Sequence, residues 1–265
     1  MQAPRMQSFG TFFFRNRPAL TLLIHLLKQR RGESTVNIAV LACSKGAEVY
    51  SIAYAIRCAQ INLSVKISAL DIAEDVIEFA KAGVYSLRRP GGFTNGPNSV
   101  AVDTFVDQPS SIFERMSPQE MAALFDREDG RLRIKPEFRA GISWHLGDAA
   151  DPNLVDRIGT QDIIIANQFL CHMCPKKAEA CLRGLARLAK PGAFIFVSGV
   201  DLAVRTMVAM DLGWTPVTEL ICEIHDGDPS LRLGWPLEYW GLEPLNRRRK
   251  DWQIRYASVF QTPRF

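Results

Sequence analysis

The sequence predicts an α/β fold: a seven-stranded, mostly parallel sheet with helices on both faces. Residues 36–71 read as an apolar strand, a turn of small residues, a helix and a second strand. Further along the chain, strongly apolar strands at 162–169 and 193–198 flank a helical pattern at 175–190. Strands that alternate with helices are typical of a parallel sheet that is covered on both sides.

Apolar spacing and cap residues define the other predicted elements. Residues 18–30 carry apolar side chains at helical spacing, with Pro18 in the first turn and Gly32 just past the end. Ser117 and Glu120 have the spacing of a capping box at the start of another helix. Two late strands are predicted to add an antiparallel edge to the sheet. The further elements are helices at 75–82 and 117–125 and strands at 142–148, 216–225 and 253–261.

Length and composition indicate one domain with appendages. A chain of 265 residues is long enough to bury a full core. Residues 1–34 are predicted to form an N-terminal helical segment, and residues 35–265 a single domain built on the sheet. Two insertions interrupt this domain: a loop and helical segment at 86–140, and a segment rich in Trp and Arg at 227–252. Within the first insertion, the abundance of Gly, Pro, Asn and Ser predicts a mobile loop at 88–111.

Charge, apolar runs and cysteines narrow the class of protein. Hydrophobic residues make up 47% and charged residues 23% of the chain, as in an ordinary globular protein. The longest apolar run, at 18–27, is too short to span a bilayer, and the first residues lack the apolar core of a secretory signal. Six scattered cysteines are typical of a reducing compartment, so a cytoplasmic location is expected. The net charge of +4 does not by itself predict nucleic-acid binding.

The segment 36–71 has the form of a nucleoside-binding half-unit. Its second strand ends on Asp71, which is placed to accept hydrogen bonds from both hydroxyls of a ribose. The turn at 42–46 lacks the G-x-G-x-x-G pattern that brings a pyrophosphate against the backbone. We therefore expect a nucleoside without phosphates, of which S-adenosylmethionine is the common one. An acid after a strand also often caps the next helix, so Asp71 taken alone fits either role.

Short motifs follow one another in a defined order along the chain. Residues 11–15 read Thr-Phe-Phe-Phe-Arg, residues 43–51 read Cys-Ser-Lys-Gly-Ala-Glu-Val-Tyr-Ser, and residues 162–167 read Asp-Ile-Ile-Ile-Ala-Asn. Over roughly residues 9–201, this order resembles the CheR-type chemotaxis receptor methyltransferases. Those enzymes methylate protein glutamates with S-adenosylmethionine. A match of several motifs in order is far more specific than a match of any one of them.

The resemblance implies a class I S-adenosylmethionine-dependent methyltransferase with a Rossmann-like sheet. In the turn, the small residues Ser44 and Gly46 let the backbone approach the methionine part of the cofactor. Glu48 is placed to meet the cofactor's ammonium group, and Arg15 to pair with its carboxylate or to hold an acidic acceptor. Asp148 is placed to accept from the adenine amino group. The expected cofactor contacts are Thr11, Arg15, Ser44, Gly46, Glu48, Asp71, Asp148, Ala149, Asn167 and Gln168.

The acceptor side departs from the family pattern. Ala166 stands where the family has an arginine, and Cys171 where it has a tyrosine that is thought to sit beside the transferred methyl. Ala47 stands where the first of two glutamates is expected. The chain starts ten residues before the aromatic motif, so the helical domain that precedes this motif in the chemotaxis enzymes is expected to be lacking. Cofactor binding is therefore a firmer expectation than methylation of receptor glutamates.

The loop after the strand at 162–169 carries the candidate base. His172 is placed there to remove a proton from a hydroxyl or an amine as the methyl transfers. The alternative is a loop histidine without a role, and His225 with Asp226 is a second candidate pair. The Cys-x-x-Cys at 171–174 lacks the second pair of ligands that a zinc site needs, so no metal is expected.

The predicted function is methyl transfer from S-adenosylmethionine to an oxygen or nitrogen of a small molecule or sugar. Arg15 and His172 are the candidate catalytic residues. Two alternatives stay open: a protein-glutamate O-methyltransferase of the chemotaxis type, and a non-catalytic module that binds S-adenosylmethionine or S-adenosylhomocysteine. The basic run at 247–250 is interpreted as a solvated turn. Neither a membrane nor a nucleic acid is expected as a partner.

Overall fold

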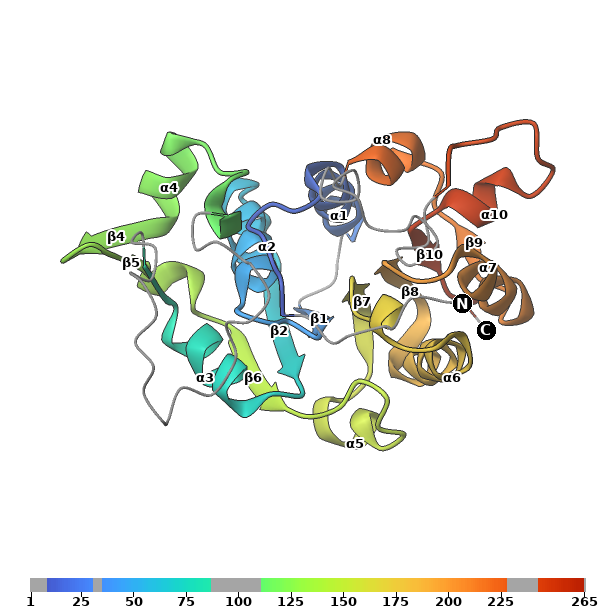
Figure 1. Cartoon of the computed structure of the whole chain (residues 1–265), viewed down its shortest axis with the longest axis horizontal. Coiled ribbons are helices and arrows are strands. Elements are labelled where there is room, and N and C mark those ends of the chain that lie inside the picture. The colour runs from blue at the N-terminus through green and yellow to red at the C-terminus, as the bar shows by residue number, and fades with distance from the viewer. Residues whose placement is uncertain (1–8, 31–34, 87–110, 228–242, 265) are drawn as a thin grey trace, which may run out of the picture.

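A seven-stranded sheet forms the centre of the computed structural model, which describes residues 9–30, 35–86, 111–227 and 243–264. Its strands are β1 Thr35–Leu41, β2 Ser64–Asp71, β6 Ile142–Leu146, β7 Gln161–Asn167, β8 Ala189–Ser198, β9 Thr215–Pro216 and β10 Val259–Gln261. They lie in the order β6-β2-β1-β7-β8-β10-β9, from left to right in Figure 1. Within this sheet, β10 runs antiparallel to β8 and β9, and the other strands are parallel to one another. The predicted fold class is confirmed.

Helices cover both faces of the sheet because neighbouring side chains of each strand point to opposite sides. Ile163 and Ile165 of β7 pack into one apolar cluster, whereas Ile164 and Ala166 pack into the other. The cluster that contains Ile163 and Ile165 is closed by α1 Arg17–Gln29, α2 Ala47–Cys58, α3 Glu74–Ala82 and α8 Ile221–Asp226. The cluster that contains Ile164 and Ala166 is closed by α5 Leu154–Ile158, α6 Pro175–Leu185, α7 Leu202–Asp211 and α10 Trp252–Tyr256. Among the described helices, none is long and apolar enough to cross a bilayer.

The C-terminal part of the chain differs from the prediction. Residues 216–225 were expected to be one strand, but they contain the end of β9 and most of helix α8. Residues 253–261 likewise divide into most of α10 and the strand β10. In α8 the buried residues Ile221, Ile224 and His225 have the spacing of a helix face, which a short apolar run conceals. Of the two expected late strands, only β10 is antiparallel to the main direction.

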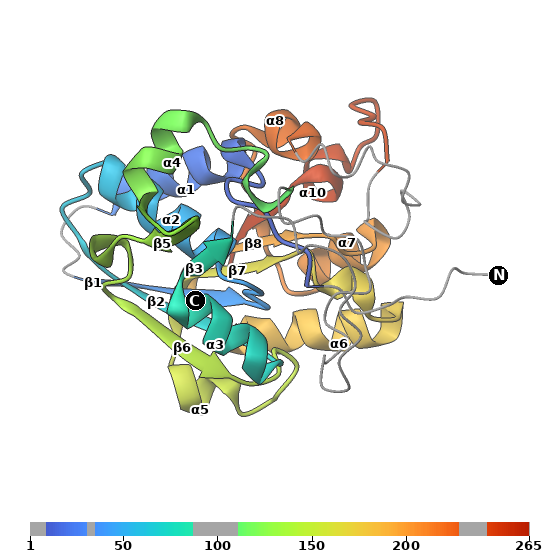
Figure 2. The same cartoon turned by 60° about the vertical axis from the view of Figure 1, so that its left-hand side comes forward.

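A second, three-stranded sheet lies beside α2 and α3 (Figure 2). It consists of β3 Val84–Ser86, β4 Phe125–Glu128 and β5 Arg131–Ile134, and α4 Pro118–Leu124 precedes β4. These strands were not predicted from the sequence, although the dipeptide Asp129-Gly130 is a hairpin signal. In the structure both residues have the positive φ that such a turn requires, at 47° and 75°. Most of the predicted loop at 88–111 and of the insertion at 227–252 lies outside the described residues.

Helix α4 ties the N-terminal segment to this second sheet. The predicted capping box is present: Ser117 Oγ accepts from the N–H of Glu120, and the Glu120 carboxylate accepts from the N–H of Ser117. The same carboxylate accepts two hydrogen bonds from the guanidinium of Arg17, at 2.7 and 2.8 Å. These hydrogen bonds lower the pKa of Glu120 to about 2, and those from Arg17 make the largest contribution.

Replacement of Glu120 is expected to make the free energy of unfolding less dependent on pH in the acid range. Glu120→Gln should lower the free energy of unfolding at pH 7 by about 1 kcal/mol or less, because Arg17 is half exposed and water screens the pair. The contribution of the carboxylate is fully present above its ordinary pKa near 4.5 and is lost as the pH falls toward 2. Urea titrations of both proteins at several pH values measure this difference, which should disappear on acidification.

The control is Glu78→Gln, which removes an exposed pair with Lys81 at 3.4 Å and should leave the free energy of unfolding unchanged. A difference between wild type and Glu120→Gln that persists undiminished at pH 2 would contradict the assignment.

Candidate active site

The carboxyl ends of the parallel strands surround a cavity of about 260 Å³. The chain proceeds from β1 outward to β2 and β6, and then returns to β7 on the other side of β1. Ligands of open α/β sheets bind at such a reversal, beyond the carboxyl ends of the strands. Of the predicted site residues, those that line this cavity are Thr11, Arg15, Ser44, Glu48, Asp71, Asp148, Ala149, Asn167, Gln168 and His172. We call it the outer cavity.

The turn between β1 and α2 brings its backbone to the cavity wall. Ala42 and Ser44 have positive φ values, at 52° and 49°, and both line the outer cavity. Such values are uncommon for residues with a Cβ, and they concentrate at functional sites. Gly46 does not line the cavity, although it was expected to contact the cofactor. It has φ +82° and starts α2, and a Cβ there would lie 3.2 Å or less from Ala80, Trp144 and Tyr50.

Asp71 is buried at the end of β2 and is held by the backbone. Its side chain is 3% exposed. Oδ2 accepts from the N–H of Ser44 at 2.7 Å, and Oδ1 accepts from the N–H of Ala73, the N-cap residue of α3, at 3.2 Å. Burial raises the pKa of Asp71, and the backbone hydrogen bonds oppose that shift. The N-cap of α3 is Ala73 and no side chain caps this helix, so Asp71 contacts the helix start without being its cap residue. A carboxylate has about four acceptor positions, so positions remain for a ribose.

The aromatic motif at 11–15 is anchored between α2 and the second sheet. The N–H of Phe13 donates to the carbonyl of Ile112 at 3.0 Å, and the N–H of Phe14 donates to Ser51 Oγ at 2.9 Å. The Phe13 ring is fully buried, with the rings of Tyr85 and Phe125 at centroid distances of 5.3 Å. This packing fixes the backbone immediately before Arg15.

Arg15 itself is held over an aromatic ring. Its guanidinium lies 4.8 Å from the centroid of the Phe12 ring and donates to the carbonyl of Gly10 at 2.9 Å. Arg115 lies at the same distance from the Phe12 ring and donates to the Arg15 carbonyl at 2.6 Å. Stacking and hydrogen bonds of this kind restrict the rotamers of a long side chain. Arg15 is therefore a positioned cation at the cavity wall.

A chain of polar side chains crosses the ends of β7 and β8. Asn167 Nδ2 donates to Glu48 Oε1, and Ser198 Oγ donates to Asn167 Oδ1, both at 2.8 Å. Gln168 Nε2 donates to Ser198 Oγ at 3.2 Å. Gln168 Oε1 is buried and has no partner among the described residues. A buried acceptor without a donor is costly, so this oxygen fits a ligand that carries an N–H or O–H group.

Asp148 and His172 line other parts of the outer cavity. Asp148 follows β6 and is exposed, and its Oδ1 accepts from the N–H of Ala150 at 2.8 Å. His172 ends a short 3-10 helix, Leu170–His172, directly after β7. Cys171 beside it is a buried thiol. Within the described ranges, no group of three or more His, Cys, Asp or Glu residues is arranged to hold a metal ion.

A smaller cavity of about 60 Å³, which we call the inner cavity, adjoins the outer one. Both cavities are lined by Arg15, Glu48, Asn167 and Gln168. The other polar residues of its wall were not predicted from the sequence to belong to this site; among them, only His225 had been considered, as part of a second candidate pair. They are Asn16, Ser51, Ser198, Arg205, His225 and Ser258.

Gly199 allows the close packing between the two cavities. It has φ +62°, and a Cβ there would lie 2.7 Å from the Cα of Gln168. Gln168 also has a positive φ, at 60°, and its N–H donates to the carbonyl of Ser198 at 2.9 Å. The Ser198-Gly199 pair after an apolar strand was the available sequence signal for this part of the site.

Comparison with known proteins supports the assignment of the cofactor. Residues 10–94 match the family model described as CheR methyltransferase, SAM binding domain. The matched segment contains the aromatic motif, the β1–α2 turn and Asp71. The predicted resemblance, the cofactor and the class of enzyme, an S-adenosylmethionine-dependent methyltransferase, are confirmed.

Relatives extend the similarity over most of the chain. A chemotaxis protein methyltransferase of Vibrio parahaemolyticus is 25% identical over 204 residues, which cover 74% of this chain and 66% of the relative. A probable biofilm formation methyltransferase, WspC, of Pseudomonas aeruginosa is 25% identical over 205 residues, 76% of this chain and 43% of the relative. A solved structure, the magnesium protoporphyrin IX methyltransferase of Synechocystis with bound SAM, aligns with a TM-score of 0.40 at 15% identity, over 75% of this chain and 69% of that chain.

Removal of the Asp71 carboxylate is expected to weaken cofactor binding. Asp71→Ala should lose about 1–3 kcal/mol of binding free energy if two ribose hydrogen bonds are lost. Isothermal titration calorimetry with S-adenosylhomocysteine measures the change. Asp75→Ala, in the first turn of α3, is the matched control and should bind normally.

Asp71→Asn complements the alanine variant because it keeps the size of the side chain. Both variants are first compared with wild type in thermal unfolding, so that a folding defect is recognised. Folded Asp71 variants with wild-type affinity would contradict a role in ribose binding.

Proposed function

We propose that this protein transfers a methyl group from S-adenosylmethionine to an oxygen or nitrogen of a small-molecule acceptor that occupies the inner cavity. Bound S-adenosylmethionine supplies a methyl group on a positively charged sulfur, which is a good leaving group. The acceptor's lone pair forms the new bond to the methyl carbon while the carbon–sulfur bond breaks. The electron pair of the broken bond stays on sulfur, which gives S-adenosylhomocysteine. The acceptor's proton, where it has one, passes to a base.

One observation carries this proposal: the two cavities meet at a shared set of polar side chains. Arg15, Glu48, Asn167 and Gln168 line both of them. A cofactor in the outer cavity and an acceptor in the inner one would therefore face each other across these residues. Enclosure of both partners supports catalysis by proximity, which is the main contribution a protein makes to an already activated cofactor.

The charges of the outer cavity suit a cationic cofactor. Among the described residues, its wall contains three carboxylates, from Glu48, Asp71 and Asp148, against one guanidinium, from Arg15. Glu48 in the first turn of α2 is proposed to meet the ammonium group of the methionine part, and Asp148 the adenine amino group. Arg15 is proposed to pair with the cofactor carboxylate or to hold an acidic acceptor. With these contacts, the negative charge of the cavity wall would stabilise the positive charge of the sulfonium group.

Protein-glutamate O-methylation is the second candidate function. Its support is that two relatives, from Vibrio parahaemolyticus and Pseudomonas aeruginosa, are named chemotaxis protein methyltransferases. This chain spans 66% and 69% of the lengths of those two relatives.

A cytoplasmic location is proposed with this function. All six cysteines are free thiols, three of them buried. Thiols that persist unpaired are typical of proteins in a reducing compartment.

The test of function uses purified protein and S-adenosylmethionine labelled in the methyl group. Acceptors are offered as a panel of hydroxyl-, amine- and carboxyl-bearing small molecules, and separately as glutamate-containing peptides. Alkali distinguishes the products, because methyl esters of carboxylates hydrolyse to volatile methanol whereas methyl ethers and methylamines do not. Label in a small-molecule product supports the proposal, and alkali-labile label in peptide alone supports the second candidate. Binding of the cofactor without transfer to any acceptor would contradict both.

His172→Ala is expected to slow turnover if His172 acts as the base. Loss of a general base typically costs about 10²–10⁴-fold in rate. His172 lines the outer cavity and not the inner one, so its imidazole would act on an acceptor atom that reaches the boundary between the two cavities. Single-turnover rates with the acceptor identified above measure the effect. The control is His25→Ala, an exposed residue of α1 that pairs with Glu219, and a wild-type rate in His172→Ala would contradict the role.

A further inference from the structure

Arg205 in α7 is a buried cation at the wall of the inner cavity. Its side chain is 3% exposed. One terminal nitrogen, Nη1, donates to the carbonyl of Val197 at 3.1 Å and to Ser258 Oγ at 3.3 Å. The other, Nη2, donates to the carbonyl of Arg255 at 2.9 Å. All of these acceptors are neutral.

No carboxylate of the described residues pairs with this guanidinium. The Nε–H of Arg205 is buried and has no hydrogen-bond partner in the described part of the chain. Burial lowers the pKa of Arg205 to about 10, and the nearby cation of Arg255 acts in the same direction. The guanidinium therefore remains charged at neutral pH. An uncompensated charge in the interior is costly, and proteins normally pair it.

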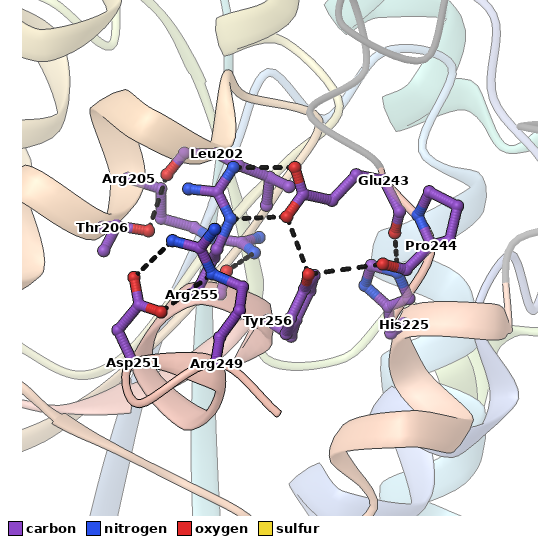
Figure 3. A network of polar contacts seen from close by, with 10 residues as sticks. All are labelled: Leu202, Arg205, Thr206, His225, Glu243, Pro244, Arg249, Asp251, Arg255 and Tyr256. Carbon is purple, nitrogen blue, oxygen red and sulfur yellow. Dashed lines mark hydrogen bonds and ion pairs between the residues drawn. The ribbon is translucent and has the colours of Figure 1, made fainter. Parts of the chain in front are cut away.

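Glu243, an acidic side chain beside Arg205, is already engaged by other groups. Glu243 accepts from Arg255 Nε at 2.6 Å and Nη2 at 2.8 Å, and from the Tyr256 hydroxyl at 2.7 Å (Figure 3). These hydrogen bonds lower the pKa of Glu243 to about 2, and those from Arg255 make the largest contribution. Glu243 is therefore ionised and paired with Arg255. Figure 3 shows Arg205 beside this network, joined to Arg255 through a main-chain carbonyl and not to Glu243.

The two cavities thus differ in charge. In the part of the chain that the structure describes, three carboxylates and one arginine line the outer cavity. The described wall of the inner cavity has two arginines, Arg15 and Arg205, and Glu48 is its one carboxylate. His225, also in its wall, is held by the Glu243 carbonyl at 2.9 Å from Nε2, and burial lowers its pKa, so it is neutral at pH 7. A cationic wall beside an acidic one favours an anionic group in the inner cavity.

We propose that Arg205 forms a carboxylate-binding subsite for the acceptor, so that the methyl acceptor is a small acid whose non-reacting carboxylate is held by Arg205 and Ser258. This inference rests on the proposed function and specifies the class of its substrate. The acceptor enters with its carboxylate toward Arg205 and its nucleophilic atom toward the residues shared with the outer cavity. Arg205 is thus a specificity-determining residue, and the reacting atoms lie elsewhere.

The size of the inner cavity favours a small molecule. A volume of about 60 Å³ corresponds to a few water-sized positions, since one such position needs about 10–15 Å³. A carboxylate with one or two methylenes fills such a space. The cavity is walled by apolar residues of α1, β7, β8 and β10, including Leu23, Ile165 and Val259, which suit the methylenes of a short acid.

The test is calorimetric titration of the full chain, saturated with S-adenosylhomocysteine, with malonate and succinate as probes and succinamide as the neutral match. We expect a diacid to bind at least about 10-fold more tightly than the diamide, as for hydrogen bonds to a charged group. Arg205→Met should remove that preference while leaving the affinity for S-adenosylhomocysteine unchanged. Arg205→Lys should retain part of it. Arg183→Met removes a half-buried cation of α6, paired with Asp211 and away from both cavities, and should behave as wild type.

Several results would overturn the inference. Equal affinities of diacid and diamide in the wild type would do so, even if Arg205→Met failed to fold. Unchanged diacid affinity in a folded Arg205→Met would do so as well. Methylation of a glutamate peptide without binding of either diacid would assign the acceptor to protein instead. If S-adenosylhomocysteine itself does not bind, the proposed function fails first, whereas cofactor binding without diacid binding contradicts only the Arg205 subsite.

Discussion

Burial of two phenylalanines holds this site together. Phe13 and Phe14 insert between α2 and the second sheet, and their backbone N–H groups are bound by Ile112 and Ser51. The next residue, Arg15, is therefore fixed at the boundary of both cavities. Because the anchoring partners come from two different parts of the chain, the arginine depends on the packing of the whole fold and not on local sequence alone.

The sheet sorts charge between the two cavities. Strands β2 and β6 deliver carboxylates beyond their ends, whereas α7 delivers a guanidinium from the opposite side. The polar chain from Glu48 through Asn167 to Ser198 lies where these two regions meet. In the function proposed above, a cationic cofactor and an anionic acceptor would occupy neighbouring positions.

Sequence patterns predicted the half of the site that lies on regular elements. Asp71 and Asn167 end strongly apolar strands, so their place at the carboxyl edge followed from the parallel sheet. Arg205 could not be predicted, because a lone arginine in a helix has the pattern of a surface residue until the packing buries it. Short elements such as α8 were also misassigned, since a run of a few apolar residues fits either a strand or a helix.

Asp71 has a consequence for how ligand binding and folding are connected. Two main-chain N–H groups orient its carboxylate before any sugar arrives, so little rotamer entropy remains to be lost on association. The dehydration of that buried charge is already a cost of the ligand-free fold. Nucleoside hydroxyls that hydrogen-bond to it offset this deficit, and they therefore stabilise the tertiary structure as well as the complex.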